Sequence, residues 1–178
     1  MVKHIDVEVL PDQLISTAKE IAGSIRSEWK LSDKVQVNVF TDGITNRLVG
    51  CFHPSNPDDV VLIRVYGNHT ELFIDRKIEI RNMKLMHESG LSPPIYATFN
   101  NGICYGYTPG SVCSYEMVKD TTISSLIAAK LARMHSLALK KSSNTFSNDE
   151  KKCTLFGSFK KYLNLLPRSL DDQIKDQR

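Results

Sequence analysis

The chain has 178 residues, 41% of them hydrophobic and 24% charged, which fits one globular domain or one domain plus part of another. Its formal net charge of +3 is too small, and its basic residues are too scattered, to indicate a nucleic-acid partner. The sequence has no apolar run near the roughly 18 residues of a membrane span, and its polar N-terminus does not resemble a secretory signal. The cysteines lack C-x-x-C spacing, so we expect reduced thiols in a cytoplasmic protein; they are Cys51, Cys104, Cys113 and Cys153.

The first part of the chain predicts one helix and then three strands. Apolar residues recur at helical spacing over residues 11–29, and Pro11 suits the first helical position. Alternating valines predict a strand over 34–40. Residues 47–52 and 60–66 are the next predicted strands, and the Pro, Asn and Ser content of 53–59 indicates a loop between them.

The second part predicts a helix, a hairpin and further helices. Asp75 can cap a helix over 76–88, and Gly90 can end it. Two strands at 95–99 and 103–107 flank the turn signal Asn-Asn-Gly. Helices are predicted at 121–139 and near 156–166. This order matches the small lobe of a protein-kinase-like fold, but many α+β domains share it.

The turn TDGITN, residues 41–46, joins the first two predicted strands. Such a tip can aim backbone N–H groups at an anion, and its small side chains let a phosphate approach. Asp-Gly is also a common turn dipeptide, so a simple turn is the first explanation when the tip is considered alone.

Arg64 is a charged residue in an otherwise apolar strand. Side chains alternate along a strand, so Val61 and Ile63 face one side and Arg64 faces the other, inner side. A buried guanidinium needs an anionic partner to offset its desolvation. That partner can be a nucleotide phosphate or Glu79, which lies in the following predicted helix; the remaining alternative is an edge-strand arginine that reaches solvent.

Protein kinases use a comparable pair. A lysine on their third strand binds phosphates and is held in place by an acid on the next helix. Arginine at this position keeps the charge and adds a planar fork suited to phosphate. The segment YGYTPGS, residues 105–111, would then follow the last strand as the hinge between two lobes.

Three stretches closely resemble the ethanolamine kinases of the choline/ethanolamine kinase family: FTDGITNRLVGCF, DVVLIRVYGNHTELFIDR and GLSPPIYATFNNGICY. The resemblance runs from about residue 36 to 140. It implies an α+β, protein-kinase-like fold with a five-stranded antiparallel small lobe, one inserted helix and the start of a helical large lobe. The implied divisions are an N-terminal helical segment (1–33), the small lobe (34–108) and a truncated large lobe (109–178).

The resemblance also implies a chemistry. ATP and Mg²⁺ would be the cofactors, and the hydroxyl of ethanolamine would be phosphorylated in the first step of phosphatidylethanolamine synthesis. The implied ATP-binding residues are Asp42, Gly43, Ile44, Thr45 and Asn46 in the phosphate loop, the pair Arg64 and Glu79, and Gly106, Tyr107 and Thr108 in the hinge. Gly106 departs from the acidic or amide residue that the family usually has there, which puts side-chain contacts to adenine in doubt.

The catalytic residues of the family have no counterpart in this sequence. The family uses a His-x-Asp segment and a later metal-binding aspartate, whereas His135 here is followed by Ser136 and Leu137. We therefore expect the catalytic and metal-binding residues beyond Arg178, and no activity from residues 1–178 alone. The alternatives are a kinase with a shorter large lobe, a choline kinase, or a non-catalytic module with an ATP-lobe fold. Exposed large-lobe helices would favour self-association.

Overall fold

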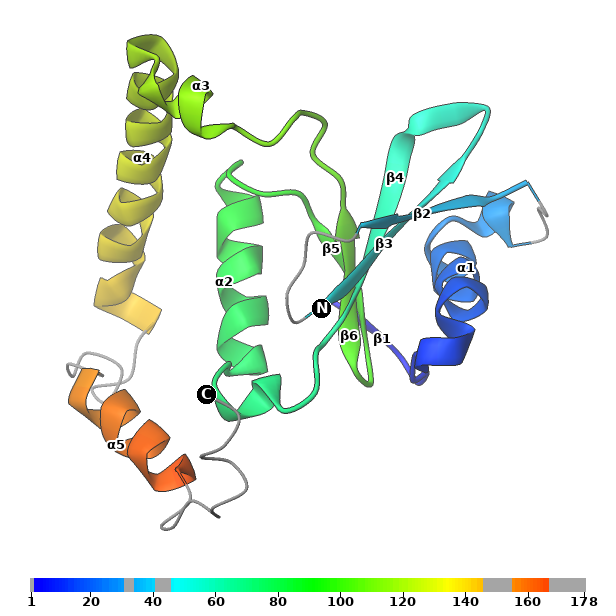
Figure 1. The fold of residues 1–178 in the computed structure, drawn as a ribbon, viewed down its shortest axis with the longest axis horizontal. Helices are drawn as coiled ribbons and strands as arrows, with labels where there is room; N and C mark the ends of the chain where they lie inside the picture. Colours follow the sequence, from blue (N-terminus) through cyan, green and yellow to red (C-terminus); the bar gives the residue numbers. More distant parts are fainter. Residues whose placement is uncertain (1, 31–33, 41–45, 146–154, 167–178) are drawn as a thin grey trace, which may run out of the picture. The chain divides into compact units, whose positions relative to one another are not determined.

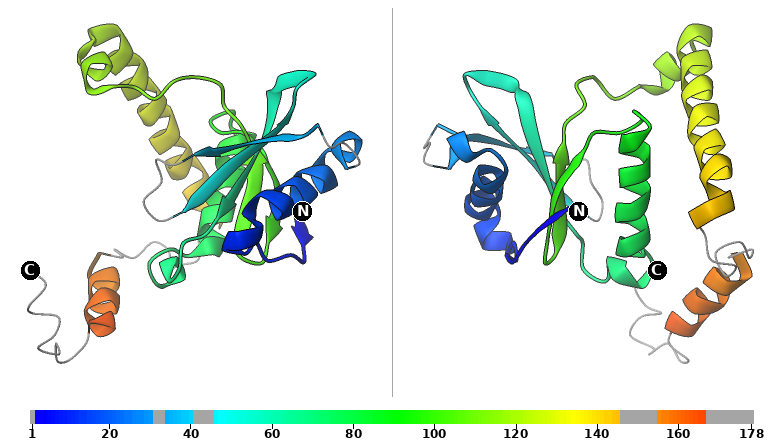
Figure 2. Two further views of the ribbon diagram at one scale, coloured as in Figure 1. Left: turned by 45° about the vertical axis from the view of Figure 1, so that its right-hand side comes forward. Right: turned by 180° about the vertical axis from the view of Figure 1, so that it is seen from behind.

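A computed structural model describes residues 2–30, 34–40, 46–145 and 155–166, with side chains in the last helical turns before residue 145 left aside. The chain forms two compact units, residues 1–130 and 131–178. The first unit holds a sheet with helices on both sides, and the second holds the end of one long helix and a further helix (Figures 1 and 2).

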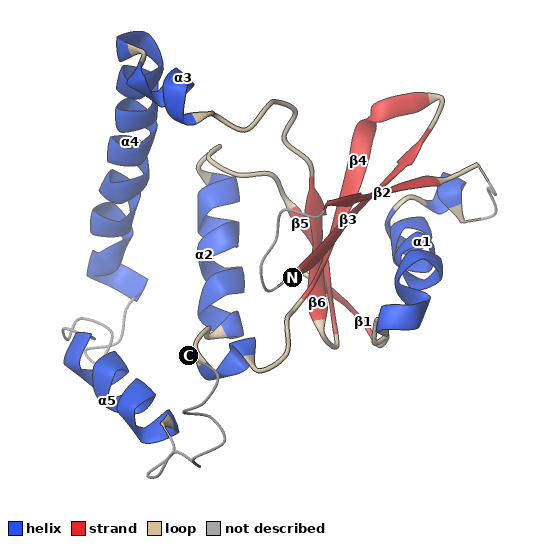
Figure 3. Ribbon diagram, in the orientation of Figure 1, coloured by secondary structure: helices blue, strands red, loops and turns tan. Residues whose placement is uncertain are grey.

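The sheet has six strands in the order β1-β5-β6-β4-β3-β2 (Figure 3). All neighbouring pairs are antiparallel except β1 and β5, which are parallel. The strands are β1 (Lys3–Ile5), β2 (Gln36–Phe40), β3 (Arg47–His53), β4 (Asn56–Val65), β5 (Ile95–Phe99) and β6 (Gly102–Gly106).

The expected five-stranded antiparallel sheet is therefore wrong by one strand. Strand β1 is three residues long and mostly exposed, so no alternating pattern marks it in the sequence. It exists because it pairs with β5, more than 90 residues away, with Lys3 opposite Ala97. The region expected to be only helical thus also supplies an edge of the sheet.

The loop expected at 53–59 is much shorter than predicted. The β3–β4 ladder continues to the pair His53 and Asn56, so β4 begins four residues before the predicted strand at 60–66. Pro57 and Asp58 are exposed in this part of β4, which explains why their composition indicates a loop.

One face of the sheet packs against helix α1 (Leu14–Ile25), and this is where the main core lies (Figure 1). Val61 and Ile63 of β4 are fully buried in it beside Ile21 of α1. Cys51 and Cys104 are buried in the same core, and burial raises the pKa of both thiols to about 12. The helix predicted over 11–29 is confirmed in its middle, while its two ends are the short 3-10 helices η1 (Pro11–Gln13) and η2 (Ser27–Trp29).

The opposite side of the sheet carries helix α2 (Arg76–Glu88), as the sequence predicts. The Asp75 side chain accepts hydrogen bonds from the N–H groups of Lys77 and Ile78, so the predicted N-cap is confirmed. Gly90, with a φ of 68°, ends the helix in a Schellman motif, in which Leu91 N–H donates to the Met86 carbonyl. Both ends of α2 are thus fixed by local signals.

Three helices follow the sheet. They are α3 (Tyr115–Lys119), α4 (Thr121–Thr145) and α5 (Leu155–Leu165). The five-residue α3 was absent from the predicted elements because it is short and begins with a local Ser114 cap. Helix α4 is longer than predicted, and its Leu126 and Leu131 side chains are exposed. No helix among the described residues is both long and apolar enough to cross a membrane.

Asn101 holds the N-terminal segment against the β5–β6 hairpin. Its side chain accepts a hydrogen bond from the Val9 N–H at 3.0 Å and donates one to the Val9 carbonyl at 3.0 Å. Its neighbour Asn100 donates its backbone N–H to the carbonyl of Val7. The Asn101 amide thus bonds both backbone groups of Val9, as a neighbouring strand would, and fixes the segment between β1 and α1.

Arg26 ties the end of α1 to the sheet. Its Nε and Nη2 donate to the two carboxylate oxygens of Asp59 on β4, at 2.8 and 2.7 Å. Its Nη2 also lies 3.2 Å from the hydroxyl of Tyr96 on β5, and its guanidinium lies 4.8 Å from the centroid of that ring. The hydrogen bonds to Arg26 lower the pKa of Asp59 below its ordinary value of 3.8.

Replacing Asp59 by Asn should destabilise the fold in a pH-dependent way. A carboxylate with a lowered folded-state pKa stabilises the protein above its unfolded pKa and loses this contribution as the pH falls through the folded pKa. We expect Asp59→Asn to lower the free energy of unfolding by roughly 1.5–3 kcal/mol at pH 7. The difference from wild type should shrink below pH 3.8. Denaturant unfolding at several pH values measures both effects, with the exposed Asp58→Asn as control.

Removing the Asn101 side chain should loosen the N-terminal segment. Asn101→Ala leaves the N–H and carbonyl of the buried residue Val9 without these partners, at a cost of about 1–3 kcal/mol in unfolding free energy. Amide exchange at Val9 should accelerate. Asn100→Ala is the matched control, because the amide of that side chain donates an exposed hydrogen bond to Asp6. Equal effects of the two substitutions would contradict the assigned role.

Candidate functional site

Arg64 and Glu79 lie in contact on the α2 side of the sheet. Arg64 is next to last in β4, and Glu79 lies in the first turn of α2, where the Asp75 cap determines the start of the helix. The Arg64 Nη2 donates to Glu79 Oε1. The two side chains are 22% and 20% exposed, so water screens this ion pair only in part. The structure therefore brings together the two residues that the sequence singled out.

A second arginine shares the same carboxylate. Arg76 Nη1 donates to Glu79 Oε2 at 2.9 Å, and its Nη2 donates to the Thr70 hydroxyl. Two guanidinium groups thus face one carboxylate, so this cluster of three side chains has a net charge of +1. The Nε of Arg64 is buried and has no hydrogen-bond partner among the described residues. A buried donor beside excess positive charge is suited to an anion.

Two tyrosine rings border the arginines. The Arg64 guanidinium lies 5.8 Å from the ring centroid of Tyr66 and 5.9 Å from that of Tyr105, within the range of cation–π contacts. Burial, and then the charge of Glu79, raises the pKa of Tyr66, and burial raises the pKa of Tyr105. Both phenols therefore stay neutral and leave the positive charge of the cluster uncompensated.

The predicted phosphate loop can be placed only at its edges. Asp42, Gly43, Ile44 and Thr45 lie outside the described residues, whereas Asn46 is described and half-buried immediately before β3. On the two strands that flank the turn, Phe40 pairs with Leu48, and Leu48 in turn pairs with Arg64. The strand ends on either side of the turn thus lie level with Arg64 in the sheet, Leu48 on the neighbouring strand and Phe40 one strand further away.

The predicted hinge begins inside the sheet. Gly106 is the last residue of β6, and its N–H donates to the Pro94 carbonyl at 2.9 Å. A Cβ at this position would lie 3.1–3.2 Å from Pro93, Pro94 and the Tyr96 hydroxyl, so the packing explains the glycine. Tyr107 and Thr108 follow the end of the strand. Backbone contacts to a base would have to come from these two residues rather than from the Gly106 N–H.

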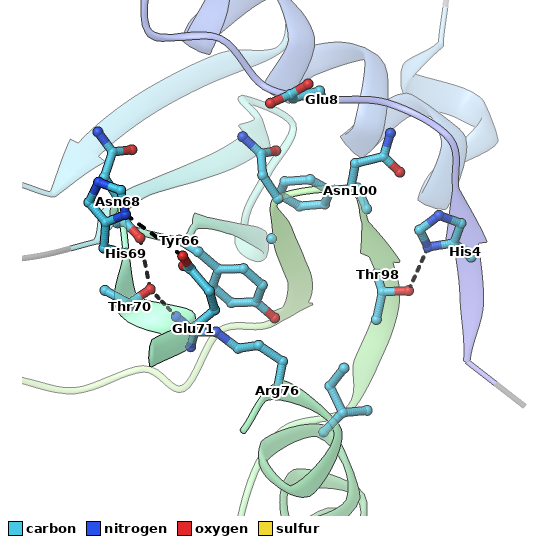
Figure 4. A pocket seen from close by; sticks show the side chains of 15 residues that line it. His4, Glu8, Tyr66, Asn68, His69, Thr70, Glu71, Arg76, Thr98 and Asn100 are labelled. Atoms are coloured by element: carbon cyan, nitrogen blue, oxygen red, sulfur yellow. Dashed lines mark hydrogen bonds and ion pairs between the residues drawn. The ribbon is translucent and has the colours of Figure 1, made fainter. Parts of the chain in front are cut away.

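A cavity of about 720 Å³ opens beside this cluster at the end of β4 (Figure 4). Tyr66 and Arg76 line it together with residues of the β5–β6 turn, but Arg64 and the predicted hinge do not. It is therefore a different space from the one that Arg64 would share with a nucleotide. Over the described part of the chain, no three His, Cys, Asp or Glu side chains are grouped to hold a metal ion.

Arg76 is the site residue that sequence reasoning missed. Its spacing of three residues from Glu79 is a signal for a helical ion pair, but such pairs are common on exposed helices. Its contact with Tyr66, at 3.7 Å from the ring centroid, depends on the path of residues 66–75 and has no signature in the sequence.

Comparison with known proteins supports the resemblance seen in the sequence. The choline/ethanolamine kinase family profile matches residues 37–177. Human ethanolamine kinase 2 is 38% identical over 136 residues, which are 76% of this chain and 35% of that protein. A probable ethanolamine kinase of Nematostella vectensis is 35% identical over 178 residues, covering 99% of this chain and 49% of its own length. The chain thus spans between about a third and a half of these curated relatives.

Solved structures agree on the fold. A Plasmodium vivax ethanolamine kinase superposes with a TM-score of 0.71 at 22% identity, covering 93% of this chain and 48% of its own. A choline kinase from Cryptosporidium parvum gives a TM-score of 0.64 at 20% identity, with 92% and 47% coverage. The match of the family profile over most of the sequence, together with these relatives, shows that the chain belongs to the choline/ethanolamine kinase family.

Proposed function

We propose that this chain supplies the ATP-binding lobe of an ethanolamine kinase, an enzyme that phosphorylates the ethanolamine hydroxyl. Arg64 holds the nucleotide phosphates, Glu79 holds Arg64 in place, and the turn at 42–46 contributes backbone N–H groups. Tyr107 and Thr108 offer the hinge backbone to adenine. The observation that carries the proposal is the buried Nε–H of Arg64 beside a cluster with excess positive charge.

The physical case rests on charge balance. A half-buried guanidinium is stabilised by one ionic partner, and here Glu79 divides its two oxygens between two guanidiniums. Adding a phosphate oxygen at the Arg64 Nε would pair this buried donor and offset the excess charge. Arginine suits this position better than lysine does, because its planar fork can bind Glu79 with one nitrogen and a phosphate with another.

Several parts of the proposal rest on the family rather than on the described residues. We assign the Mg²⁺ that accompanies ATP no ligand here, and we assign the proton acceptor of the reaction to residues outside this chain. We propose ethanolamine rather than choline as the substrate because the two relatives compared above are an ethanolamine kinase and a probable ethanolamine kinase. Cytoplasmic ATP is the expected phosphoryl donor, in keeping with the free buried thiols of Cys51 and Cys104.

Substitution of Arg64 tests the phosphate site. Arg64→Ala should weaken ATP binding by about 1.5–3 kcal/mol, or roughly 10- to 100-fold, because a charge-assisted hydrogen bond and a charge are lost. Arg64→Lys should lose less, since the charge remains but the fork does not. Isothermal titration of the 178-residue chain with ATP measures both effects. Lys77→Ala, an exposed cation in the same region, controls for loss of charge. Unchanged affinity in Arg64→Ala would exclude Arg64 from the site.

The proposed substrate needs a separate test. Residues 1–178 incubated with Mg²⁺, ATP and ethanolamine should yield no phosphoethanolamine above background, whereas a fusion to the C-terminal half of the Nematostella relative should form it. A positioned general base typically contributes about 10²–10⁴-fold to such a step, which makes its loss easy to detect. Turnover by residues 1–178 alone would place the catalytic groups inside this chain. A fusion that prefers choline would contradict the proposed substrate.

A further inference from the structure

Two arginine–carboxylate pairs in this chain differ in one respect. Asp59 accepts from both the Nε and the Nη2 of Arg26, which is the bidentate arrangement. Of the Arg64 nitrogens, only Nη2 donates to Glu79, and the buried Nε has no partner within the described part of the chain. Both pairs are partly buried to a similar extent. Burial therefore does not explain why one pair is bidentate and the other is not.

The second oxygen of Glu79 explains the difference. It accepts from Arg76 Nη1 at 2.9 Å, so it is turned away from the Arg64 Nε. We propose that Arg76 is a positioning residue, which keeps Glu79 to a single hydrogen bond with Arg64 and so leaves the buried Arg64 Nε–H unpaired, to be bound by a phosphate oxygen once the side chain is uncovered. This inference rests on the proposed function of the site and assigns it a residue on which phosphate affinity depends.

Arg76 is itself held by two contacts besides the one with Glu79. Its guanidinium stacks on Tyr66, 3.7 Å from the ring centroid. Its Nη2 donates to the Thr70 hydroxyl, which in turn donates to the Gly67 carbonyl at 2.8 Å. Figure 4 shows Arg76 reaching from α2 toward Tyr66 and Thr70 at the wall of the cavity. Because the β4–α2 connection fixes the guanidinium, Arg76 can in turn fix the orientation of Glu79.

A direct role of Arg76 in binding the anion is the competing explanation. Both terminal nitrogens of Arg76 already donate within the protein, and one face of the guanidinium is covered by Tyr66. The group is 17% exposed. Arg64 instead has a buried nitrogen, Nε, that no residue in the described ranges pairs with. The geometry thus assigns the contact with phosphate to Arg64 and the orientation of the Glu79 carboxylate to Arg76.

The test compares ATP with adenosine, which lacks phosphates. In the 178-residue chain, Arg76→Gln should weaken ATP binding roughly tenfold, the lower end of what a charge-assisted hydrogen bond contributes. Adenosine affinity should stay within about twofold, or less than about half a kcal/mol, because adenosine has no phosphate for Arg64 to bind. Arg76→Lys should recover part of the ATP affinity. Lys77→Gln, which removes a cation from the same turn of α2, should change neither.

A double substitution separates the two roles of Arg76. In an Arg64→Ala background, Arg76→Gln should cause no further loss of ATP affinity, because the nitrogen that it makes available is gone. Additive losses would mean that Arg76 binds the phosphate itself. Equal losses of ATP and adenosine affinity would mean a merely structural role. Either result would overturn the proposal.

The Nε–H signal of Arg64 in ¹⁵N-resolved proton NMR gives a readout that needs no nucleotide. In wild type it should be a slowly exchanging signal without a carboxylate acceptor, identified by its loss in Arg64→Lys. In Arg76→Gln it should shift downfield as Glu79 becomes bidentate. If wild type binds neither ATP nor adenosine, the proposed function fails, and this signal still decides the role of Arg76. An unchanged Arg64 signal in Arg76→Gln would overturn the inference.

Discussion

The Glu79 carboxylate joins the two elements on which the rest of the site depends. It links α2 to β4 through Arg64, and it accepts from Arg76, whose guanidinium also donates to Thr70 in the β4–α2 connection. The opposite face is held differently, by a core of apolar side chains between α1 and the sheet. The α1 side of the sheet thus carries the main apolar core, whereas the other side combines the buried Leu62 with the Arg64–Glu79 ion pair.

This division agrees with the sequence of β4. Val61 and Ile63 alternate with Leu62 and Arg64, so one strand contributes to both environments. A shift of register by one residue would bury the arginine in the apolar core and expose the valines. The pairing of Arg64 with Leu48 on one side and Ile103 on the other fixes that register from two neighbouring strands. The central position of β4 in the sheet therefore protects the orientation of Arg64.

Local signals were sufficient to predict the elements whose ends are determined locally. Helix α2 was predicted at the correct residues because Asp75 and Gly90 act through neighbouring backbone groups. Strand β1 could not be predicted in this way, because its hydrogen bonds go to β5 and its side chains are mostly exposed. Strand alternation placed Arg64 on the inner face of the sheet, and Glu79 was singled out among its possible partners by likeness to the lysine–acid pair of protein kinases. The role of Arg76 did not follow, because it depends on a ring brought close by an irregular connection.

The attachment of Gly106 determines where the backbone can begin to turn after the sheet. Its N–H is bound to Pro94, and two prolines and a tyrosine hydroxyl surround its Cα, so the last residue of β6 is anchored from the side. Torsional freedom therefore starts at Tyr107 and increases at Gly110, whose φ of 147° few other residues adopt. The connection after β6 is therefore fixed at its first end, at Gly106, and can change conformation only beyond it. Backbone groups up to Gly106 thus keep their distance from Arg64, whereas those from Tyr107 onward can change it.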